Sequence, residues 1–251
     1  MPNEITRDDN VRTYDNTVRI CGRLCSVRRV KRDEVRFKVL VAKMRKKHGT
    51  YEPLRDENGK IVSDVHTIRF FDKNAEHYEN MFVPGDFVCV TAMAIDVRNQ
   101  YTCKNKSDLF GVSIEPKRVG NYTRHDASVF TIRGKVTSLF ERTWGDNTRQ
   151  LVTLYVKSEK PSYMLDGTLG TVSYNTYVTA SIDSNSAKVL AKTLQKGDFV
   201  ELRGRVVESV QKDTHVIQNF YHATRLSVID RGNSSASVVN DQLNVPAPKR
   251  G

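Results

Sequence analysis

The tetrapeptide GDFV occurs twice in this chain of 251 residues, at positions 85–88 and 197–200, which are 112 residues apart. The same offset aligns RICGRLCS at 19–26 with TIRGKVTS at 131–138. Matches in two widely separated stretches at a single offset indicate a duplicated unit of about 110 residues. A unit of that length can bury a hydrophobic core of its own, so we expect the chain to form two domains.

Hydropathy alternation predicts that each unit is all-β. In the first unit, residues 18–25 and 35–42 alternate as half-buried strands do, and a third strand ends near Phe71. Residues 73–81 predict a short helix, and the turn at 84–86 then leads into a fourth strand. A fifth strand follows, and the second unit repeats this order. Three strands, a short helix and two strands are typical of an OB-fold barrel.

The repeat also sets the expected domain boundaries. We expect an N-terminal arm at 1–16, a first OB-fold domain at 17–118, a linker at 119–128, a second OB-fold domain at 129–230 and a disordered tail at 231–251. The linker is short and polar, so we expect the two barrels to lie side by side without rigid packing. Asn58-Gly59 between strand-like flanks predicts a protruding hairpin arm on the first barrel.

The composition favours a polyanionic partner. The net charge is +11 and the isoelectric point is about 9.5, which points to nucleic acid more than to a membrane surface or to solubility alone. The N-terminal stretch has no hydrophobic segment, and the longest apolar runs are only strand-sized. We therefore expect a soluble, cytoplasmic protein with no membrane partner.

The sequence offers no pattern of a catalytic or metal site. The four cysteines, Cys21, Cys25, Cys89 and Cys103, lack paired CxxC spacing, and no two histidines have metal-ligand spacing. Reduced structural thiols are favoured over a metal site or a disulfide framework. The motifs GxSxG, GxxxxGK[ST] and HExxH do not occur. We therefore expect no enzymatic activity, no metal and no cofactor.

Positive charge is concentrated in the first unit. Between Thr17 and His48 there are twelve Lys or Arg residues against Asp33 and Glu34, a local balance of +10. A solvated face usually mixes both signs, so a groove that follows phosphates is favoured over a bland surface. The candidate phosphate contacts are Arg19, Arg23, Arg36 and Lys38, which share outward strand parity, and Arg45, Lys46 and Lys47 near the hairpin arm.

Aromatic side chains could add base stacking. Strand parity in the first unit turns Ile68 and Phe70 inward, and it turns Arg69 and Phe71 outward. A ring beside an arginine on the ligand face of an OB barrel suits single-strand binding, because every base has a face that can stack. An outward Phe71 could equally cover the hairpin arm or a subunit interface.

The second unit carries its own candidates. Tyr155 and Tyr177 have outward parity on the second and third strands, with Lys157 beside the former, and Lys135 takes the place of Arg23 in the repeat. Three further rings, those of Trp144, Tyr163 and Tyr174, are expected in loops. Each tyrosine alone is ordinary surface chemistry, so the second unit is a weaker candidate than the first.

Several stretches resemble the bacterial-type single-stranded-DNA-binding proteins. In the second unit these are VFTIRGKVTS at 129–138, LVTLYVKSEK at 151–160, LQKGDFVELRGRV at 194–206 and THVIQNFYHATRLSVI at 214–229. In the first unit they include ICGRL, FKVLVAK and IRFFDKNAEHYENMFVPGDFVCV. The order and spacing of these pieces over about 200 residues carry the resemblance.

The resemblance implies a role for Phe71, because an aromatic ring closes the third strand in that family and stacks on DNA. The corresponding place in the second unit is Ser181 or Ile182, so that unit departs from the pattern. The chain ends in PAPKRG instead of an acidic tail, so recruitment of partners through such a tail is not expected. Four barrels commonly assemble in the family, and two barrels in one chain therefore imply a homodimer or a monomer.

We therefore expect two tandem OB-fold barrels that bind and protect single-stranded DNA with little sequence preference. The expected setting is replication, recombination, repair or transfer of DNA in a bacterial cytoplasm or nucleoid, and a phage, a plasmid or a mobile element is one source of such a gene. An RNA-binding OB-fold protein and a non-catalytic structural subunit of a replication or conjugation assembly are the alternatives. A metal-dependent nuclease is the least favoured hypothesis.

Overall fold

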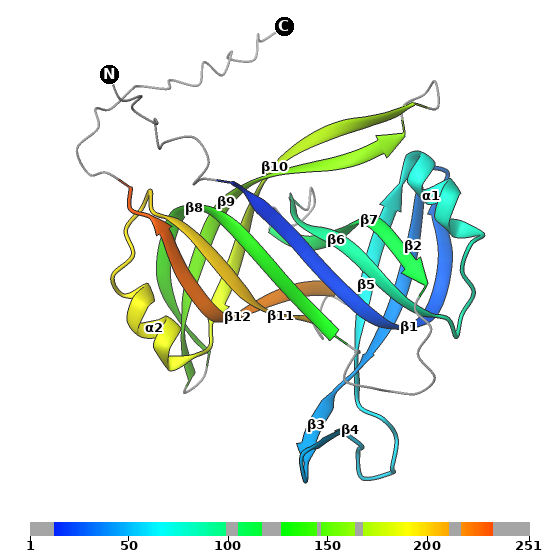
Figure 1. Ribbon diagram of the computed structural model, residues 1–251, viewed down its shortest axis with the longest axis horizontal. Helices are drawn as coiled ribbons and strands as arrows, with labels where there is room; N and C mark the ends of the chain where they lie inside the picture. Colours follow the sequence, from blue (N-terminus) through cyan, green and yellow to red (C-terminus); the bar gives the residue numbers. More distant parts are fainter. Residues whose placement is uncertain are drawn as a thin grey trace, which may run out of the picture.

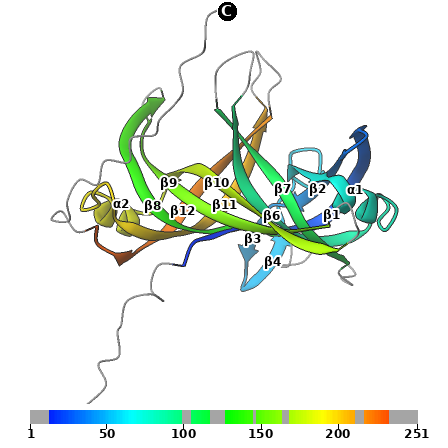
Figure 2. The same cartoon turned by 90° about the horizontal axis from the view of Figure 1, so that it is seen from above.

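The protein is all-β with two short helices, which confirms the fold class expected from the sequence. The computed structural model describes residues 13–98, 105–116, 127–144, 147–163, 168–210 and 217–232. Most of the expected N-terminal arm, linker and tail lies outside these residues. The two helices lie at opposite ends of the molecule, and the strands form a continuous sheet between them (Figures 1 and 2).

The first ring of strands, barrel 1, closes on itself. Its elements are β1 (Asp15–Lys31), β2 (Glu34–Ala42), β5 (Ser63–Phe71), α1 (Asp72–Glu79), β6 (Phe87–Arg98) and β7 (Asn105–Pro116). The strands pair in the order β1-β2-β5-β7-β6, and β6 pairs again with β1. Only the β5–β7 pair is parallel among them. The hairpin of β3 (Met44–Lys47) and β4 (Thr50–Pro53) protrudes from this barrel (Figure 1).

The second ring, barrel 2, repeats this topology. Its elements are β8 (Ala127–Trp144), β9 (Asn147–Tyr163), β10 (Leu169–Ile182), α2 (Asn185–Ala191), β11 (Phe199–Val210) and β12 (Ile217–Asp230). The strands pair in the order β8-β9-β10-β12-β11, and β11 pairs again with β8. A five-stranded closed ring with a helix between its third and fourth strands is the OB arrangement.

The repeated GDFV sequence forms the same turn in both barrels. Gly85 and Gly197 have φ angles of 104° and 103°, a left-handed region that side chains with a Cβ rarely adopt. Asp86 and Asp198 each accept a hydrogen bond at 2.9 Å from the backbone N–H three residues earlier. The Phe and Val that follow are buried as the fourth strand begins. The tetrapeptide is therefore a structural signature of strand entry, which explains its duplication.

The two barrels share a seam in which β1 pairs with β8 in antiparallel orientation. Val18 lies directly opposite Phe130, which is its own equivalent at the repeat offset, and both side chains are buried. The pairing runs from Asp15 opposite Arg133 to Cys21 opposite Ala127. A pairing that is centred on equivalent residues gives the barrels a pseudo-two-fold relationship, as in an isologous interface.

Polar contacts lock the barrels together beyond the seam. The Asn16 amide donates to the Ala94 carbonyl and to Ser158 Oγ, both at 2.8 Å. The Glu208 carboxylate of barrel 2 accepts a hydrogen bond of 2.7 Å from the Thr67 backbone N–H of barrel 1. The expectation of loosely linked barrels is therefore wrong. It considered only the linker, whereas the packing comes from pairing between β1 and β8, which lie far apart in the sequence.

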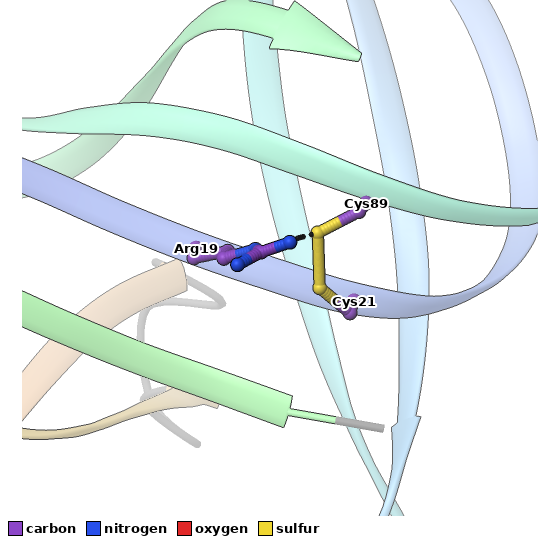
Figure 3. Close-up of a disulfide and its surroundings, with 3 residues drawn as sticks. All are labelled: Arg19, Cys21 and Cys89. Atoms are coloured by element: carbon purple, nitrogen blue, oxygen red, sulfur yellow. Dashed lines mark hydrogen bonds between the residues drawn. A yellow bond between two sulfur atoms is a disulfide. The ribbon is translucent and has the colours of Figure 1, made fainter. Parts of the chain in front are cut away.

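Two of the four cysteines form a disulfide. Cys21 of β1 lies directly opposite Cys89 of β6, and the Cα atoms are 4.1 Å apart (Figure 3). Arg19 Nε donates a hydrogen bond of 3.0 Å to Cys89 Sγ. The expectation of reduced thiols is therefore wrong for this pair, because cross-strand register is not visible in cysteine spacing. Cys25 is free and exposed, and Cys103 lies outside the described residues.

Candidate nucleic-acid interface

The outer face of barrel 1 presents basic residues in register on β2 and β5. Arg36 lies opposite Arg69, and Lys38 lies opposite Thr67. Lys38 is exposed to solvent. The two arginines, in contrast, both bind Glu34, with Nε to Oε1 distances of 2.6 Å for Arg36 and 2.9 Å for Arg69. Both arginines are therefore engaged in ion pairs, whereas Lys38 forms none with the residues that the structure describes.

Glu34 is the centre of this ion-pair network and is only 1% exposed. Burial acts to raise the pKa of its carboxyl group, but hydrogen bonds from Arg69 and Arg36 outweigh that effect and hold the pKa below its ordinary value. Arg69 also binds the buried Asp108, with an Nη1 to Oδ2 distance of 2.5 Å. The charge count along the sequence treats Glu34 as one more surface acid. In the fold it neutralises part of the basic cluster from within.

Phe71 lies beside this network with its ring partly exposed. Strand parity is confirmed, since Ile68 and Phe70 are fully buried. The Phe71 ring packs on Phe110 of β7 at a centroid distance of 4.8 Å. The Arg69 guanidinium carbon lies 5.0 Å from the Phe71 ring centroid and 5.6 Å from that of Phe110. Phe71 is therefore part of a packed aromatic and cationic cluster and is not an isolated ring.

Barrel 2 reaches this cluster through the hairpin of β9 and β10, which extends towards barrel 1 (Figure 1). The Tyr174 ring lies 6.4 Å from the Phe110 ring. Burial and the nearby Asp72 carboxylate raise the pKa of the Tyr174 hydroxyl. The expectation that Trp144, Tyr163 and Tyr174 lie in loops is wrong, because β8, β9 and β10 continue far enough to include them. The long hairpin is stabilised by its contact with the neighbouring barrel.

The other basic candidates of the first unit lie in separate places. Arg19 is exposed on the β1–β8 seam, opposite Val129. Arg23 lies opposite Leu40 on β2, and its Nη1 donates to a backbone carbonyl at 3.1 Å. On the β3–β4 hairpin, Arg45 and Lys47 lie 2.7 and 3.9 Å from Glu52, and the side chain of Lys46 lies outside the described part. The cluster in the sequence thus divides among a seam, a barrel face and a hairpin.

Barrel 2 presents a row of tyrosines. Lys135, Tyr155 and Tyr177 lie side by side across β8, β9 and β10. The rings of Tyr155 and Tyr177 are 5.5 Å apart, and Tyr177 is 51% exposed. Tyr14 extends the row, with its ring 6.2 Å from Tyr155 and 5.6 Å from Lys157 Nζ. We call Tyr14, Tyr155 and Tyr177 the tyrosine row, and cations flank it on two sides.

Tyr14 was not identified from the sequence. It precedes β1, in the segment that sequence reasoning assigned to an N-terminal arm, and its ring crosses to barrel 2 because the seam brings the start of β1 beside β9. The Tyr14 ring also packs edge-on against Phe199 at 5.1 Å. The sequence around Tyr14 does not indicate this contact, because the contact depends on how the two barrels pair through β1 and β8.

The residue of barrel 2 equivalent to Phe71 is Asp183. The parallel pairs place Ser181 opposite His222, just as Arg69 lies opposite Phe110 in barrel 1. The expected counterpart, Ser181 or Ile182, is therefore wrong by one or two positions. The equivalent residues of the two barrels are defined by the parallel pairs β5–β7 and β10–β12, which strand parity alone does not reveal. Barrel 2 has an acid where barrel 1 has a ring.

Asp183, Ser181 and His222 form a hydrogen-bonded group. Its geometry is not that of a catalytic triad, in which serine and the acid bind different nitrogens of the histidine ring. Ser181 Oγ and Asp183 Oδ2 both lie 3.0 Å from the same atom, His222 Nδ1. A serine nucleophile needs the opposite ring nitrogen, Nε2, as its base. Burial lowers the pKa of His222, and the Asp183 carboxylate partly opposes that effect. The arrangement therefore differs from that of a serine-histidine-acid triad.

The described residues give no sign of a metal centre or a membrane span. Within these ranges, no three His, Cys, Asp or Glu side chains gather as metal ligands would. Neither of the two described helices has the length and apolar character needed to cross a membrane.

The chain folds as two OB-type barrels, and two solved structures of single-stranded DNA binding proteins have a similar fold. The wild-type single-stranded DNA binding protein from Thermus aquaticus matches with a TM-score of 0.55 at 18% identity, over 89% of this chain and 97% of that one. A deletion mutant of the Thermus aquaticus protein matches with a TM-score of 0.55 at 16% identity, over 86% and 94% of the two chains. No protein-family model and no curated protein matches the sequence significantly. These likenesses therefore describe the fold alone.

Proposed function

We propose that the protein binds single-stranded DNA with little sequence preference and without catalysis. The observation that carries the proposal is the tyrosine row of barrel 2, in which partly exposed rings lie beside Lys135 and Lys157. Rings stack on bases of any identity, and neighbouring cations meet the phosphates. The likeness of fold to the Thermus aquaticus single-stranded DNA binding protein supports the same choice.

Barrel 1 contributes a second set of contacts in this proposal. Lys38, Arg23 and the hairpin arm supply positive charge, and the partly exposed Phe71 supplies a ring. The barrels are joined by the seam, so a single strand would meet both in a fixed geometry. Protection of single strands during replication, recombination, repair or transfer in a bacterial cytoplasm is the role that such binding would serve.

Titration of the protein with oligo-dT tests the proposal. Tyrosine fluorescence should fall as bases stack on the rings, and log affinity should fall linearly with log salt concentration, at about 0.7 per phosphate contact. Oligo-U of matched length distinguishes DNA from RNA as the preferred ligand. Weak binding with no dependence on salt would favour a structural subunit whose barrels contact other proteins.

A further inference from the structure

Barrel 2 carries a cationic groove whose lining residues are not part of the proposed site. The groove has a volume of about 410 Å³ and lies between β8, β11 and β12. Its lining includes Val129, Gly204 and three arginines, Arg203, Arg205 and Arg225. All three arginines are exposed, and Val129 is 45% exposed. The groove thus combines a partly apolar floor with positive charge at its rim.

The arrangement of these arginines is unfavourable for the fold itself. Arg203 and Arg225 lie directly opposite each other on β11 and β12. Like charges in directly opposite positions destabilise a sheet. Arg203 is partly compensated by Glu201, which also binds Arg133. Arg225 has no ion pair within the described residues, so its charge faces solvent beside a second cation.

Barrel 1 has the same fold as barrel 2 but lacks these charges at the equivalent positions. The pair equivalent to Arg203 and Arg225 is Thr91 and Ser113, which lie opposite each other on β6 and β7. The residue equivalent to Arg205 is Met93, which is buried. A groove of about 520 Å³ lies at this equivalent place, and its lining includes residues of β9. The arginines are therefore specific to the barrel 2 groove, where no lining residue comes from barrel 1.

Strand β8 connects this groove to the tyrosine row. Lys135 lies next to Tyr155 on one side of the strand, and Thr131 lies next to Arg203 on the other. Thr131, Arg133 and Lys135 share outward parity, so the path between the two features is about 13 Å along one strand. Arg133 lies midway on this path. Glu201 pairs with Arg133 there, so positive charge is concentrated at the two ends of this path, at Lys135 and in the groove.

We propose that this arginine groove binds the phosphate backbone of a nucleic-acid strand that leaves the tyrosine row and passes around barrel 2. Guanidinium groups bind phosphates through paired hydrogen bonds, and the apolar floor suits sugars that carry no charge. The proposal rests on the proposed function and extends it to a second face. It assigns roles to Arg205 and Arg225, neither of which forms an ion pair within the described ranges of the chain.

The experiment compares two lengths of oligo-dT, about 10 and about 40 nucleotides, because one OB fold covers about 4 to 16. The test variant is Arg205→Met with Arg225→Ser, which installs the residue types of barrel 1. The control is Lys188→Met with Lys192→Ser, which removes two charges at α2. We expect the test variant to bind the short oligomer as the parent does. It should bind the long oligomer about tenfold more weakly, with a salt slope reduced by about 1.4 for two lost phosphate contacts.

Three outcomes would overturn the arginine groove as a binding site. The first is an unchanged affinity and salt slope of the test variant for the long oligomer. The second is an equal loss in the control variant, which would reduce the effect to net charge. The third is a change in sedimentation with unchanged DNA binding, which would make this face an interface between copies of the chain. Short-oligomer binding by the parent tests the proposed function separately.

Discussion

Tyr155 and Tyr177 lie directly opposite each other on β9 and β10, with their rings 5.5 Å apart. Both side chains point away from the barrel core, and Tyr177 is half exposed. Two neighbouring rings on adjacent strands offer a surface for successive bases. Exposure of these rings to water is unfavourable, and stacking on the flat apolar faces of a ligand would offset that free-energy cost.

Replacing Tyr177 with alanine should weaken single-strand binding by about 1 to 3 kcal/mol, the usual value of one stacked base. The melting temperature should change little, because half of the side chain is already in water. Fluorescence titration with oligo-dT and thermal unfolding measure the two effects. Tyr177→Phe keeps the ring and should bind almost as the parent does, so an equal loss in that variant would contradict stacking.

Phe71 and Phe70 form a matched pair of neighbours on β5. Phe71→Ala should weaken binding by about 1 to 3 kcal/mol and also cost some stability, since its ring packs on Phe110. Phe70→Ala should act on stability alone, by about 3 to 5 kcal/mol, because that ring is fully buried. Denaturant unfolding and oligo-dT titration of both variants distinguish these effects. Unchanged binding in Phe71→Ala would mean that the cluster with Tyr174 only joins the barrels.

The fold within each repeat could be predicted from the sequence. The offset between the two GDFV copies predicted two equivalent units, and alternation correctly placed Phe70 inside. These properties are local, because they depend on turn geometry and on the two-residue period of a strand. The order of elements then defined the OB topology without any knowledge of contacts between the units.

Contacts between the repeats could not be predicted in this way. The seam that pairs Val18 with Phe130, the crossing of Tyr14 to barrel 2 and the disulfide from Cys21 to Cys89 all depend on register between distant strands. The local charge balance overestimated the free positive charge for a related reason. It does not show that Glu34 is buried and lies among the arginines. Pairing across the fold decides which charges remain free.

Asp96 predicts a pH-dependent stability at the contact between the barrels. Its backbone N–H donates to Thr176 Oγ1 of barrel 2 at 2.9 Å, and burial raises the pKa of its carboxyl group to about 6. A raised pKa means that the folded state favours the protonated acid. The contribution of Asp96 to stability is therefore most favourable below the ordinary pKa of 3.8 and is lost as pH rises through about 6.

Replacing Asp96 with asparagine should remove this dependence. We expect Asp96→Asn to be more stable than the parent at pH 8, by about 3 kcal/mol, and similar to it at pH 4, where the parent carboxyl is protonated. Urea unfolding at the two pH values measures the difference. A loss of stability at pH 8 but not at pH 4 would contradict this, because it would show that the carboxylate makes a favourable contact when ionised.

Lys38 and Arg36 are two cations on β2 that the sequence treats alike and the fold separates. Lys38 is exposed, whereas Arg36 donates to the buried Glu34. Lys38→Glu should leave the melting temperature nearly unchanged and reduce the salt slope of oligo-dT binding by about 0.7, the effect of one lost phosphate contact. Arg36→Glu should lower the melting temperature, because it places a second carboxylate beside Glu34. Unfolding by Lys38→Glu, or a change in the salt slope alone by Arg36→Glu, would contradict this assignment. It would mean that Arg36 is not the structural residue of the two.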